Sequence, residues 1–214
     1  MSVAENLKSV RERIANAGRN PDEVAIVAVT KSFGPEVCRE AVSAGLKVLG
    51  ENRVQEALAK MDAVDDARWH LIGHLQTNKV RPAARRFALI QSVDSAHLAE
   101  ALARSDPEQP VLVEVNVARE AQKSGVDPER ALDLVGQVAG MLDLRGLMAM
   151  GPAEGDPRPA FDEMRALRAE AEQRLGKSLP ILSMGMSGDF EAAVASGSTM
   201  VRLGQVLFGS RRSR

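Results

Sequence analysis

The sequence predicts a (β/α)8 barrel, and two observations support this fold class. Eight short apolar runs recur along the 214 residues, and stretches with helical periodicity lie between them. The first run, 24–29, is apolar throughout instead of alternating, which is typical of a strand covered on both faces in a parallel sheet. Eight strands that alternate with helices in about 200 residues are what this barrel requires.

The predicted elements alternate along the chain. Ser2 and Glu5 form a capping box that opens a helix ending near Gly18, and another helix begins at Pro35 and stops at Gly45. Further helical patterns cover 54–61, 80–86, 98–102 and 161–175, and one more opens at 127. The strands are expected at 24–29, 46–50, 69–73, 88–93, 111–117, 144–150, 181–186 and 200–204.

A doubly wound open sheet is the structural alternative. That fold usually has fewer strands and a glycine-rich loop after the first one, where this chain has Thr30-Lys31-Ser32-Phe33-Gly34. No long linker divides the chain, and the short Pro- and Gly-rich stretch 151–159 is interpreted as a loop. The sequence therefore favours one barrel domain over residues 1–214.

Composition and charge exclude several classes of protein. The 28 basic residues balance the 29 acidic ones, so nucleic acid or an anionic membrane surface is not expected as the main partner. No apolar run is long enough to span a bilayer, and the charged, amphipathic segment 1–20 predicts no secretory signal. The single cysteine, Cys38, cannot form an internal disulfide. A cytoplasmic globular protein is expected.

Ligands of such barrels bind at the carboxyl ends of the strands, so the residues at these ends are the candidates for chemistry. Polar groups at most of the ends would converge on one mouth. The candidate positions are Lys31, 51–53, 73–76, Asp94, Asn116, 148–151, 183–189, Arg202 and Gly204.

Lys31 follows the apolar run 24–29, and two interpretations of it are open. Partial desolvation would favour the neutral amine, which attacks a carbonyl group. Alternatively, the side chain extends along the barrel rim and keeps its charge in water.

The small residues near Ser187 and Gly204 also allow two interpretations. They let backbone N–H groups approach an anion, and a helix beginning near Ser187 would point its positive end at the usual phosphate position of a barrel. The alternative is that they are turn and cap residues. A rim lysine and a phosphate site together indicate a phosphorylated carbonyl compound as ligand.

Other candidates are weaker. His70 and His74 lie far apart along an extended strand and its exit, and no further ligand completes a metal site. Cys38 is predicted to be a core residue and His97 a solvated one. Four methionines are expected to fill core gaps: Met148, Met150, Met184 and Met186. Arg81, Arg85 and Arg86 are interpreted as a weak basic patch. Arg211, Arg212 and Arg214 are interpreted as a frayed terminus.

Six motifs, in order and over nearly the whole chain, resemble those of the pyridoxal 5′-phosphate homeostasis proteins, the YggS/PROSC family. They are Ala-Val-Thr-Lys at 28–31, Gly-Glu-Asn-Arg-Val-Gln-Glu at 50–56, Trp-His-Leu-Ile-Gly-His-Leu-Gln at 69–76, Arg-Gly-Leu-Met-Ala-Met at 145–150, Leu-Ser-Met-Gly-Met-Ser-Gly-Asp at 182–189 and Ser-Thr-Met-Val-Arg-Leu-Gly at 198–204. The resemblance implies a barrel of the alanine racemase N-terminal type, which is fold type III of the pyridoxal phosphate proteins.

The resemblance also implies a role for each site residue. Lys31 would hold pyridoxal 5′-phosphate as a Schiff base, and Arg202 would face the pyridine nitrogen. The phosphate would be bound by Ser187 and by the backbone N–H groups of Gly204 and Gln205. Asn52 would line the pocket. The segment 32–35, Ser-Phe-Gly-Pro, departs from the Thr-Lys-Pro of many relatives at the pocket rim.

A family member of this type is expected to carry its cofactor without efficient catalysis. An arginine can only donate to the ring nitrogen, which then stays unprotonated and withdraws electrons weakly. The sequence contains no Tyr, the second acid or base of related racemases. The chain is thus predicted to be a monomeric carrier that passes the cofactor to apo-enzymes. The alternatives are a weak amino-acid racemase and, less favoured, a lysine-dependent aldolase.

Overall fold

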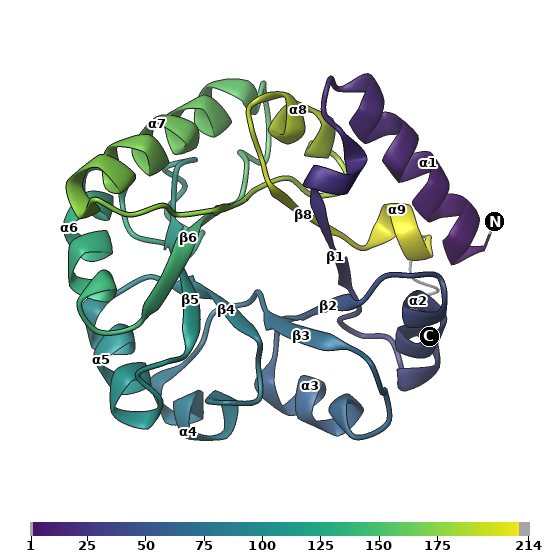
Figure 1. Cartoon of the computed structure of the whole chain (residues 1–214), viewed down its shortest axis with the longest axis horizontal. Helices are drawn as coiled ribbons and strands as arrows, with labels where there is room; N and C mark the ends of the chain where they lie inside the picture. Colours follow the sequence, from purple (N-terminus) through teal and green to yellow (C-terminus); the bar gives the residue numbers. More distant parts are fainter. Residues whose placement is uncertain (1, 210–214) are drawn as a thin grey trace.

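Eight parallel strands close into a barrel in the computed structural model, which describes residues 2–209 (Figure 1). The strands are β1 Ala25–Val29, β2 Val48–Glu51, β3 Arg68–Leu71, β4 Leu89–Val93, β5 Pro110–Val115, β6 Asp143–Ala149, β7 Ile181–Ser183 and β8 Met200–Leu203. β8 pairs with β1 from Ala25↔Met200 to Ala28↔Leu203, which completes the ring. The predicted fold class and all eight predicted strands are confirmed, with ends that differ by at most three residues.

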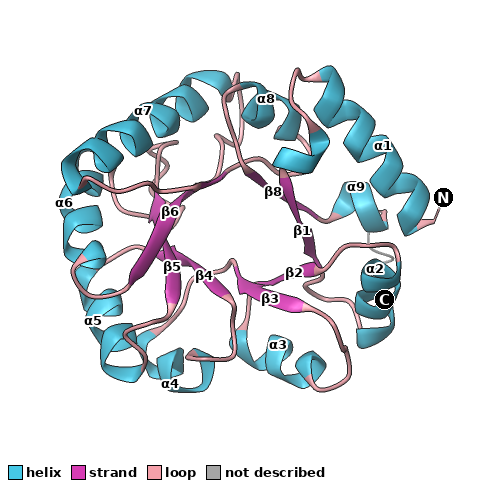
Figure 2. Cartoon of the chain, in the orientation of Figure 1, coloured by secondary structure: helices cyan, strands magenta, loops and turns pink. Residues whose placement is uncertain are grey.

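Helices surround the strands on the outside of the barrel (Figure 2). They are α1 Val3–Asn16, α2 Pro35–Ser43, α3 Val54–Met61, α4 Val80–Ala83, α5 Ala96–Ser105, α6 Pro128–Ala139, α7 Arg158–Leu175, α8 Phe190–Ala195 and α9 Gln205–Phe208, with 3-10 turns η1 Pro21–Glu23 and η2 Thr77–Lys79. The predicted capping box is confirmed: Ser2 N donates to Glu5 Oε2 (2.7 Å) and Glu5 N donates to Ser2 Oγ (3.3 Å).

Two helix predictions need correction. The pattern at 80–86 is helical only as far as Ala83, because Arg85 adopts a left-handed conformation (φ 64°) that a right-handed helix cannot contain. The helix expected near Ser187 begins at Phe190 instead. Asp189 has φ −140° and ψ 5°, which a helix cannot contain, so Ser187 and Gly188 lie in a turn before the helix.

The interior of the barrel changes from apolar to polar along the strands. A cluster of apolar side chains fills one layer: Val27, Leu89, Leu112, Met148 and Met200. Successive side chains of a strand point to opposite faces, so residues two positions further along face the interior again. These residues are polar at Gln91, Glu114 and Arg202, all of which are buried. The carboxyl end of the barrel therefore carries the groups that can do chemistry.

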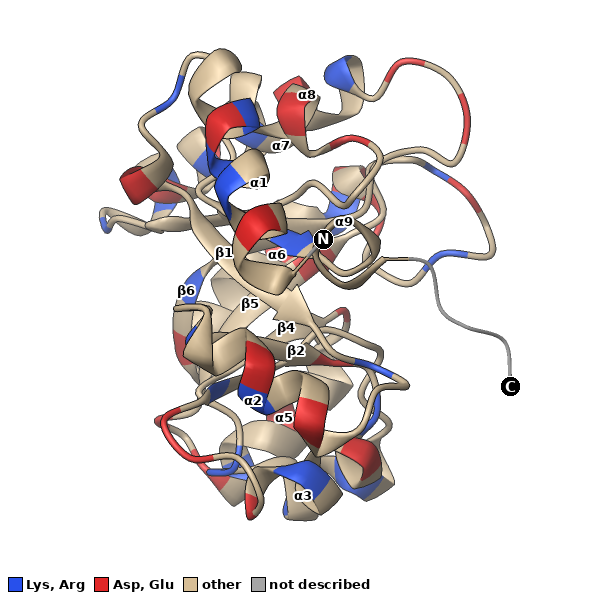
Figure 3. Cartoon of the chain, turned by 90° about the vertical axis from the view of Figure 1, so that its right-hand side faces the viewer, with Lys and Arg blue, Asp and Glu red and all other residues tan. Residues whose placement is uncertain are grey.

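Charged side chains of both signs are dispersed over the helices and loops (Figure 3), whereas the strands β1, β4 and β7 contain none. Within the weak basic patch, Arg86 pairs with Asp62 (3.2 Å) and Arg85 lies 3.7 Å from Asp106. Within the described range, no helix is long and apolar enough to cross a membrane. The three arginines of the predicted frayed terminus, Arg211, Arg212 and Arg214, lie outside the described residues.

Candidate functional site

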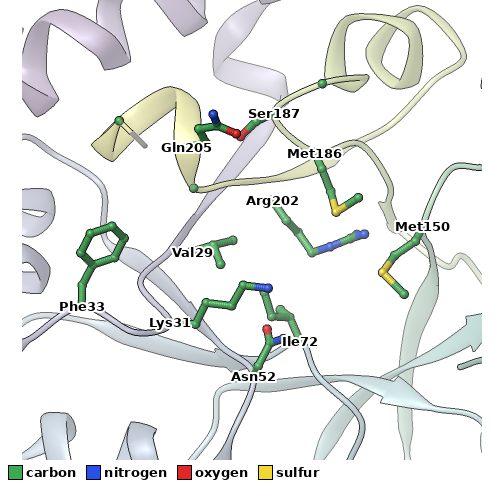
Figure 4. A pocket seen from close by; sticks show the side chains of 13 residues that line it. Val29, Lys31, Phe33, Asn52, Ile72, Met150, Met186, Ser187, Arg202 and Gln205 are labelled. Carbon is green, nitrogen blue, oxygen red and sulfur yellow. The ribbon is translucent and has the colours of Figure 1, made fainter. Parts of the chain in front are cut away.

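A cavity of about 530 Å3 opens at the carboxyl end of the barrel. It brings together all six residues that the sequence pointed to, from loops and strands far apart along the chain (Figure 4). These residues are Lys31, Asn52, Ser187, Arg202, Gly204 and Gln205.

Lys31 is held in a tight turn directly after β1. Thr30 N donates to Gly50 O of the neighbouring strand (3.0 Å), which extends the sheet pairing by one residue. Phe33 N then donates back to Thr30 O (3.1 Å), so Lys31 and Ser32 occupy the two central positions of the turn. The side chain of Lys31 is partly buried and extends into the cavity (Figure 4).

Ser187 lies against the first turn of α9. Its Oγ accepts a hydrogen bond from Val206 N (3.3 Å), and Gly204 and Gln205 line the cavity beside it. The first N–H groups of a helix have no partner within the helix and are available to an anion. The positive helix end at Ser187 thus belongs to α9, after β8, and not to the helix that follows Ser187 in the sequence.

Arg202 is 4% exposed, and three hydrogen bonds hold its guanidinium. Nη1 donates to Ser183 O (2.9 Å) and to Ser183 Oγ (2.8 Å), and Nη2 donates to Ala149 O (2.8 Å). Burial lowers the pKa of Arg202 to about 10, so the group remains cationic at neutral pH. A guanidinium has more N–H donors than these bonds use, and it can present one to the cavity that it lines.

The two histidines of the third strand region differ in exposure. His70 lies inside, where Gln91 Nε2 donates to its Nδ1 (3.0 Å), and burial lowers its pKa to about 4. His70 is therefore a neutral core residue. His74 is exposed, and its Nδ1 lies 3.1 Å from Asp94 Oδ2. Within residues 2–209, no group of three or more His, Cys, Asp and Glu side chains is arranged to hold a metal ion.

Glu114 is a buried acid that sequence reasoning did not single out. It is 3% exposed, and its Oε2 has no hydrogen-bond partner among the described residues. Burial and the nearby Asp94 raise the pKa of Glu114 to about 7, although Arg202 acts in the opposite direction. Its place two residues after Leu112, on the inward face of the predicted strand, is the signal that could have identified it.

Apolar side chains form much of the cavity wall, and most of them were not predicted. Val29, Phe33 and Ile72 contribute, and the ring of Phe33 lies 5.4 Å from that of Phe208. Met150 and Met186 also line the cavity, so the expectation that they fill core gaps is wrong. The carboxyl-end position of both explains this, because side chains there face the mouth. In contrast, Met148, Met184 and Cys38 are buried, as expected.

Known sequences match this chain over nearly its whole length. The family model "Alanine racemase, N-terminal domain" matches residues 2–212. The pyridoxal phosphate homeostasis protein of Aquifex aeolicus is 41% identical, over 99% of this chain and 100% of that protein. The protein of the same name from Pseudomonas aeruginosa is 40% identical, over 98% of this chain and 96% of that protein.

Solved structures of similar shape include PipY of Synechococcus elongatus. Without pyridoxal phosphate, it matches with a TM-score of 0.88 and 36% identity, over 97% of this chain and 100% of that chain. With pyridoxal phosphate bound, it matches with a TM-score of 0.85 and 35% identity over the same shares. Alanine racemase of Corynebacterium glutamicum matches with a TM-score of 0.79 and 18% identity, over 99% of this chain and 61% of that one, which is a likeness of fold alone.

Proposed function

The chain belongs to the family of pyridoxal phosphate homeostasis proteins, and from that membership we propose that its cavity binds pyridoxal 5′-phosphate. One observation carries the proposal: Lys31, Ser187 and Arg202 line the same cavity. PipY, the relative that was solved with pyridoxal phosphate bound, supports it.

The donors of the cavity match the three functional parts of this cofactor. An aldehyde requires an amine, and Lys31 has one. A phosphate ester requires N–H and O–H donors, which Ser187 and the first turn of α9 provide through Gly204 and Gln205. A pyridine nitrogen requires a donor, which Arg202 provides. Asn52 and the apolar wall would enclose the ring.

Lys31 is the residue that we propose to make the covalent bond. Its neutral amine attacks the aldehyde carbon, one water molecule leaves, and a C=N bond, the Schiff base, remains. The partly buried position of Lys31 at the cavity wall brings its amine to where the aldehyde would bind. The bound cofactor supplies an electron-withdrawing ring to whatever amine is attached to it.

We further propose that this chain stores and delivers the cofactor without efficient catalysis. Arg202 is fixed by Ser183 and Ala149 and can only donate, which leaves the ring nitrogen unprotonated and the ring a weak electron sink. The sequence has no Tyr to act as an acid or base opposite Lys31. Lys31 is only partly buried at the cavity wall, so water and competing amines would reach the bond.

In this proposal the protein is a single barrel domain that acts as a cytoplasmic monomer and serves pyridoxal-phosphate-dependent apo-enzymes. Its one cysteine, Cys38, is buried and free, which suits a reducing compartment.

A weak amino-acid racemase is the second candidate, and Glu114 is the observation that favours it. A carboxyl group with a pKa of about 7 is well matched to proton transfer at neutral pH, and this one lies near Arg202. However, Glu114 is buried and does not line the cavity.

Two measurements on the purified protein separate these candidates from each other and from an aldolase. Titration with pyridoxal 5′-phosphate is expected to give a coloured complex that borohydride bleaches and traps, whereas an aldolase that uses a sugar phosphate would show none. Turnover assays with common amino acids then distinguish a racemase from a carrier. Absence of a coloured complex at saturating ligand would overturn the proposal.

A further inference from the structure

The turn that presents Lys31 contains an unfavourable backbone conformation. Ser32 has φ 67°, in the left-handed region that side chains disfavour. A turn with positive φ at its third position usually has Gly or Asn there. Serine at this position costs conformational free energy, so other contacts must stabilise the turn.

Behind the turn lies a cluster of three charged residues, Glu51, Glu56 and Lys60, which we call the Lys60 cluster; Glu51 and Lys60 are buried and Glu56 is partly exposed. The side chain of Lys60 is 7% exposed and that of Glu51 is fully buried. Lys60 Nζ donates to Glu51 Oε1 (2.8 Å) and to Glu56 Oε1 (2.9 Å). Its third hydrogen bond goes to the backbone oxygen of Thr30 (3.0 Å), and this uses every donor of the ammonium group.

The two glutamates of the Lys60 cluster also bond to the turn. Glu51 Oε1 accepts from Thr30 Oγ1 (2.6 Å), and Glu56 Oε1 accepts from the backbone N–H of Ser32. The cluster therefore forms hydrogen bonds to Thr30, the residue before Lys31, and to Ser32, the residue after it. None of its three members lines the cavity, so it does not touch a ligand bound there.

The charges of the Lys60 cluster strengthen its hydrogen bonds to the turn. Burial opposes ionisation of Lys60, but its hydrogen bonds to Glu51 and Glu56 raise its pKa above the ordinary value. Burial likewise opposes ionisation of Glu56, but its bonds to Lys60 and to Ser32 N lower its pKa. Both groups stay charged at neutral pH, and the bond to the Ser32 N–H is charge-assisted.

We propose that Glu56 and Lys60 are positioning residues for Lys31: they hold Thr30 and Ser32 so that the turn keeps its strained form and directs the amine into the cavity. This inference rests on the proposed role of Lys31. Glu56 and Lys60 are four residues apart on α3, so one helix face delivers both to the turn.

Substitution of Glu56 tests the inference. In Glu56→Ala, the Ser32 N–H loses its acceptor, and the turn is expected to leave its strained form. The apparent affinity for pyridoxal 5′-phosphate should then fall about five- to thirtyfold, the equilibrium factor for the usual cost of a left-handed residue. Glu170→Ala is the matched control, because Glu170 forms an i,i+4 ion pair with Arg174 on the exposed face of α7. Its affinity should stay within about twofold of the unsubstituted protein.

A rescue variant separates positioning from general stability. Glycine adopts positive φ without a side-chain clash. The turn of Ser32→Gly should therefore keep its form without the hydrogen bond from Ser32 N to Glu56. The double variant Ser32→Gly with Glu56→Ala should regain an affinity within about threefold of that of Ser32→Gly alone. A general stabilising role for Glu56 predicts no such rescue. If Glu56→Ala does not fold, Glu56→Gln, which retains an uncharged acceptor, is expected to give a smaller loss with the same rescue.

Amide hydrogen exchange of Ser32 gives an independent readout on the ligand-free protein. The inference predicts slow exchange in the unsubstituted chain and faster exchange in Glu56→Ala, with Glu170→Ala unchanged. Unaltered affinity and unaltered Ser32 exchange in Glu56→Ala would overturn it, as would a loss of affinity that Ser32→Gly does not restore. If the unsubstituted protein binds no cofactor at Lys31, the proposed function fails. The exchange experiment still decides whether Glu56 holds the Ser32 N–H.

Discussion

Arg202 is joined to Ser183 by two hydrogen bonds, one to the backbone oxygen (2.9 Å) and one to the hydroxyl (2.8 Å). The pair links β8 to β7 inside the barrel. The Ser183 hydroxyl in turn donates to Gln91 Oε1 (2.7 Å), so the guanidinium is the end of a buried polar chain. An arginine fixed in this way cannot turn aside when a ligand enters the cavity.

The first prediction concerns these hydrogen bonds of Arg202. Arg202→Lys keeps the charge, but its single nitrogen cannot replace both Nη1, which donates to Ser183, and Nη2, which donates to Ala149. Loss of one buried, charge-assisted hydrogen bond is expected to lower the free energy of unfolding by about 1.5–3 kcal/mol. Urea unfolding of the ligand-free protein measures this. Arg174→Lys, in an exposed ion pair, serves as the control and should change it by under about 1 kcal/mol. Equal effects of the two substitutions would contradict the assigned role of the contact.

The second prediction concerns the anion. If Ser187 and the first turn of α9 bind the phosphate, pyridoxal without its phosphate should bind roughly ten- to a hundredfold more weakly, because charge-assisted hydrogen bonds are lost. Ser187→Ala should reduce this ratio. Competition binding with the two ligands provides the measurement, and equal affinities would rule out the assignment.

The third prediction concerns the pH dependence of stability. Burial raises the pKa of Glu114 from 4.5 to about 7, so the folded chain holds this proton to a higher pH than the unfolded chain does. The stability that Glu114 contributes is therefore complete at low pH and is lost as the pH rises through about 7. Between about pH 5 and about pH 8 the loss is roughly 2.5 kcal/mol.

Glu114→Gln tests this prediction because the amide cannot ionise. The unfolding free energy of the variant, measured relative to that of the unsubstituted protein, should rise by roughly 2.5 kcal/mol between about pH 5 and about pH 8. A difference that does not change with pH would show that Glu114 titrates normally. Asp94 and Arg202, which act on the Glu114 carboxyl, are present in both proteins and cancel in the comparison.

Local patterns predicted the strands and the contents of the cavity because both follow from short-range rules. Continuous apolar runs such as 24–29 mark strands covered on both faces, and parallel strands bring their carboxyl ends to one side. Lys31 and Arg202, which face one cavity, are 171 positions apart (202 − 31) in the sequence, and only the assumption of a barrel joins them.

Features that depend on particular tertiary contacts were not predictable in this way. The helix expected at Ser187 starts later because the backbone of Asp189 is not helical (φ −140°, ψ 5°). Lys60 reads as an ordinary surface lysine on an amphipathic helix, and its burial follows from the position of Glu51 and of the turn after β1. Sequence spacing does not show which charged side chains will form hydrogen bonds to the backbone of a turn.

The fourth prediction concerns turnover and transfer. If Arg202 faces the ring nitrogen as proposed, and because the sequence contains no Tyr, the protein loaded with cofactor should show no racemase, decarboxylase or transaminase activity above background. The absence of a second acid or base alone is expected to lower the reaction rate by a factor of about 10²–10⁴. The same preparation, as sole cofactor source, should reactivate a pyridoxal-phosphate-dependent apo-enzyme. Robust turnover of any one amino acid would favour the racemase instead.

The central claim is that Lys31 makes the covalent bond, and the site of the bond can be located directly. The full-length protein is loaded with pyridoxal 5′-phosphate, reduced with borohydride and digested, and the modified peptide is identified by mass spectrometry. The account predicts one modified lysine per chain, at Lys31, and no adduct in a folded Lys31→Ala variant. An adduct that persists in that variant, at Lys79, Lys123 or any other lysine, would contradict it.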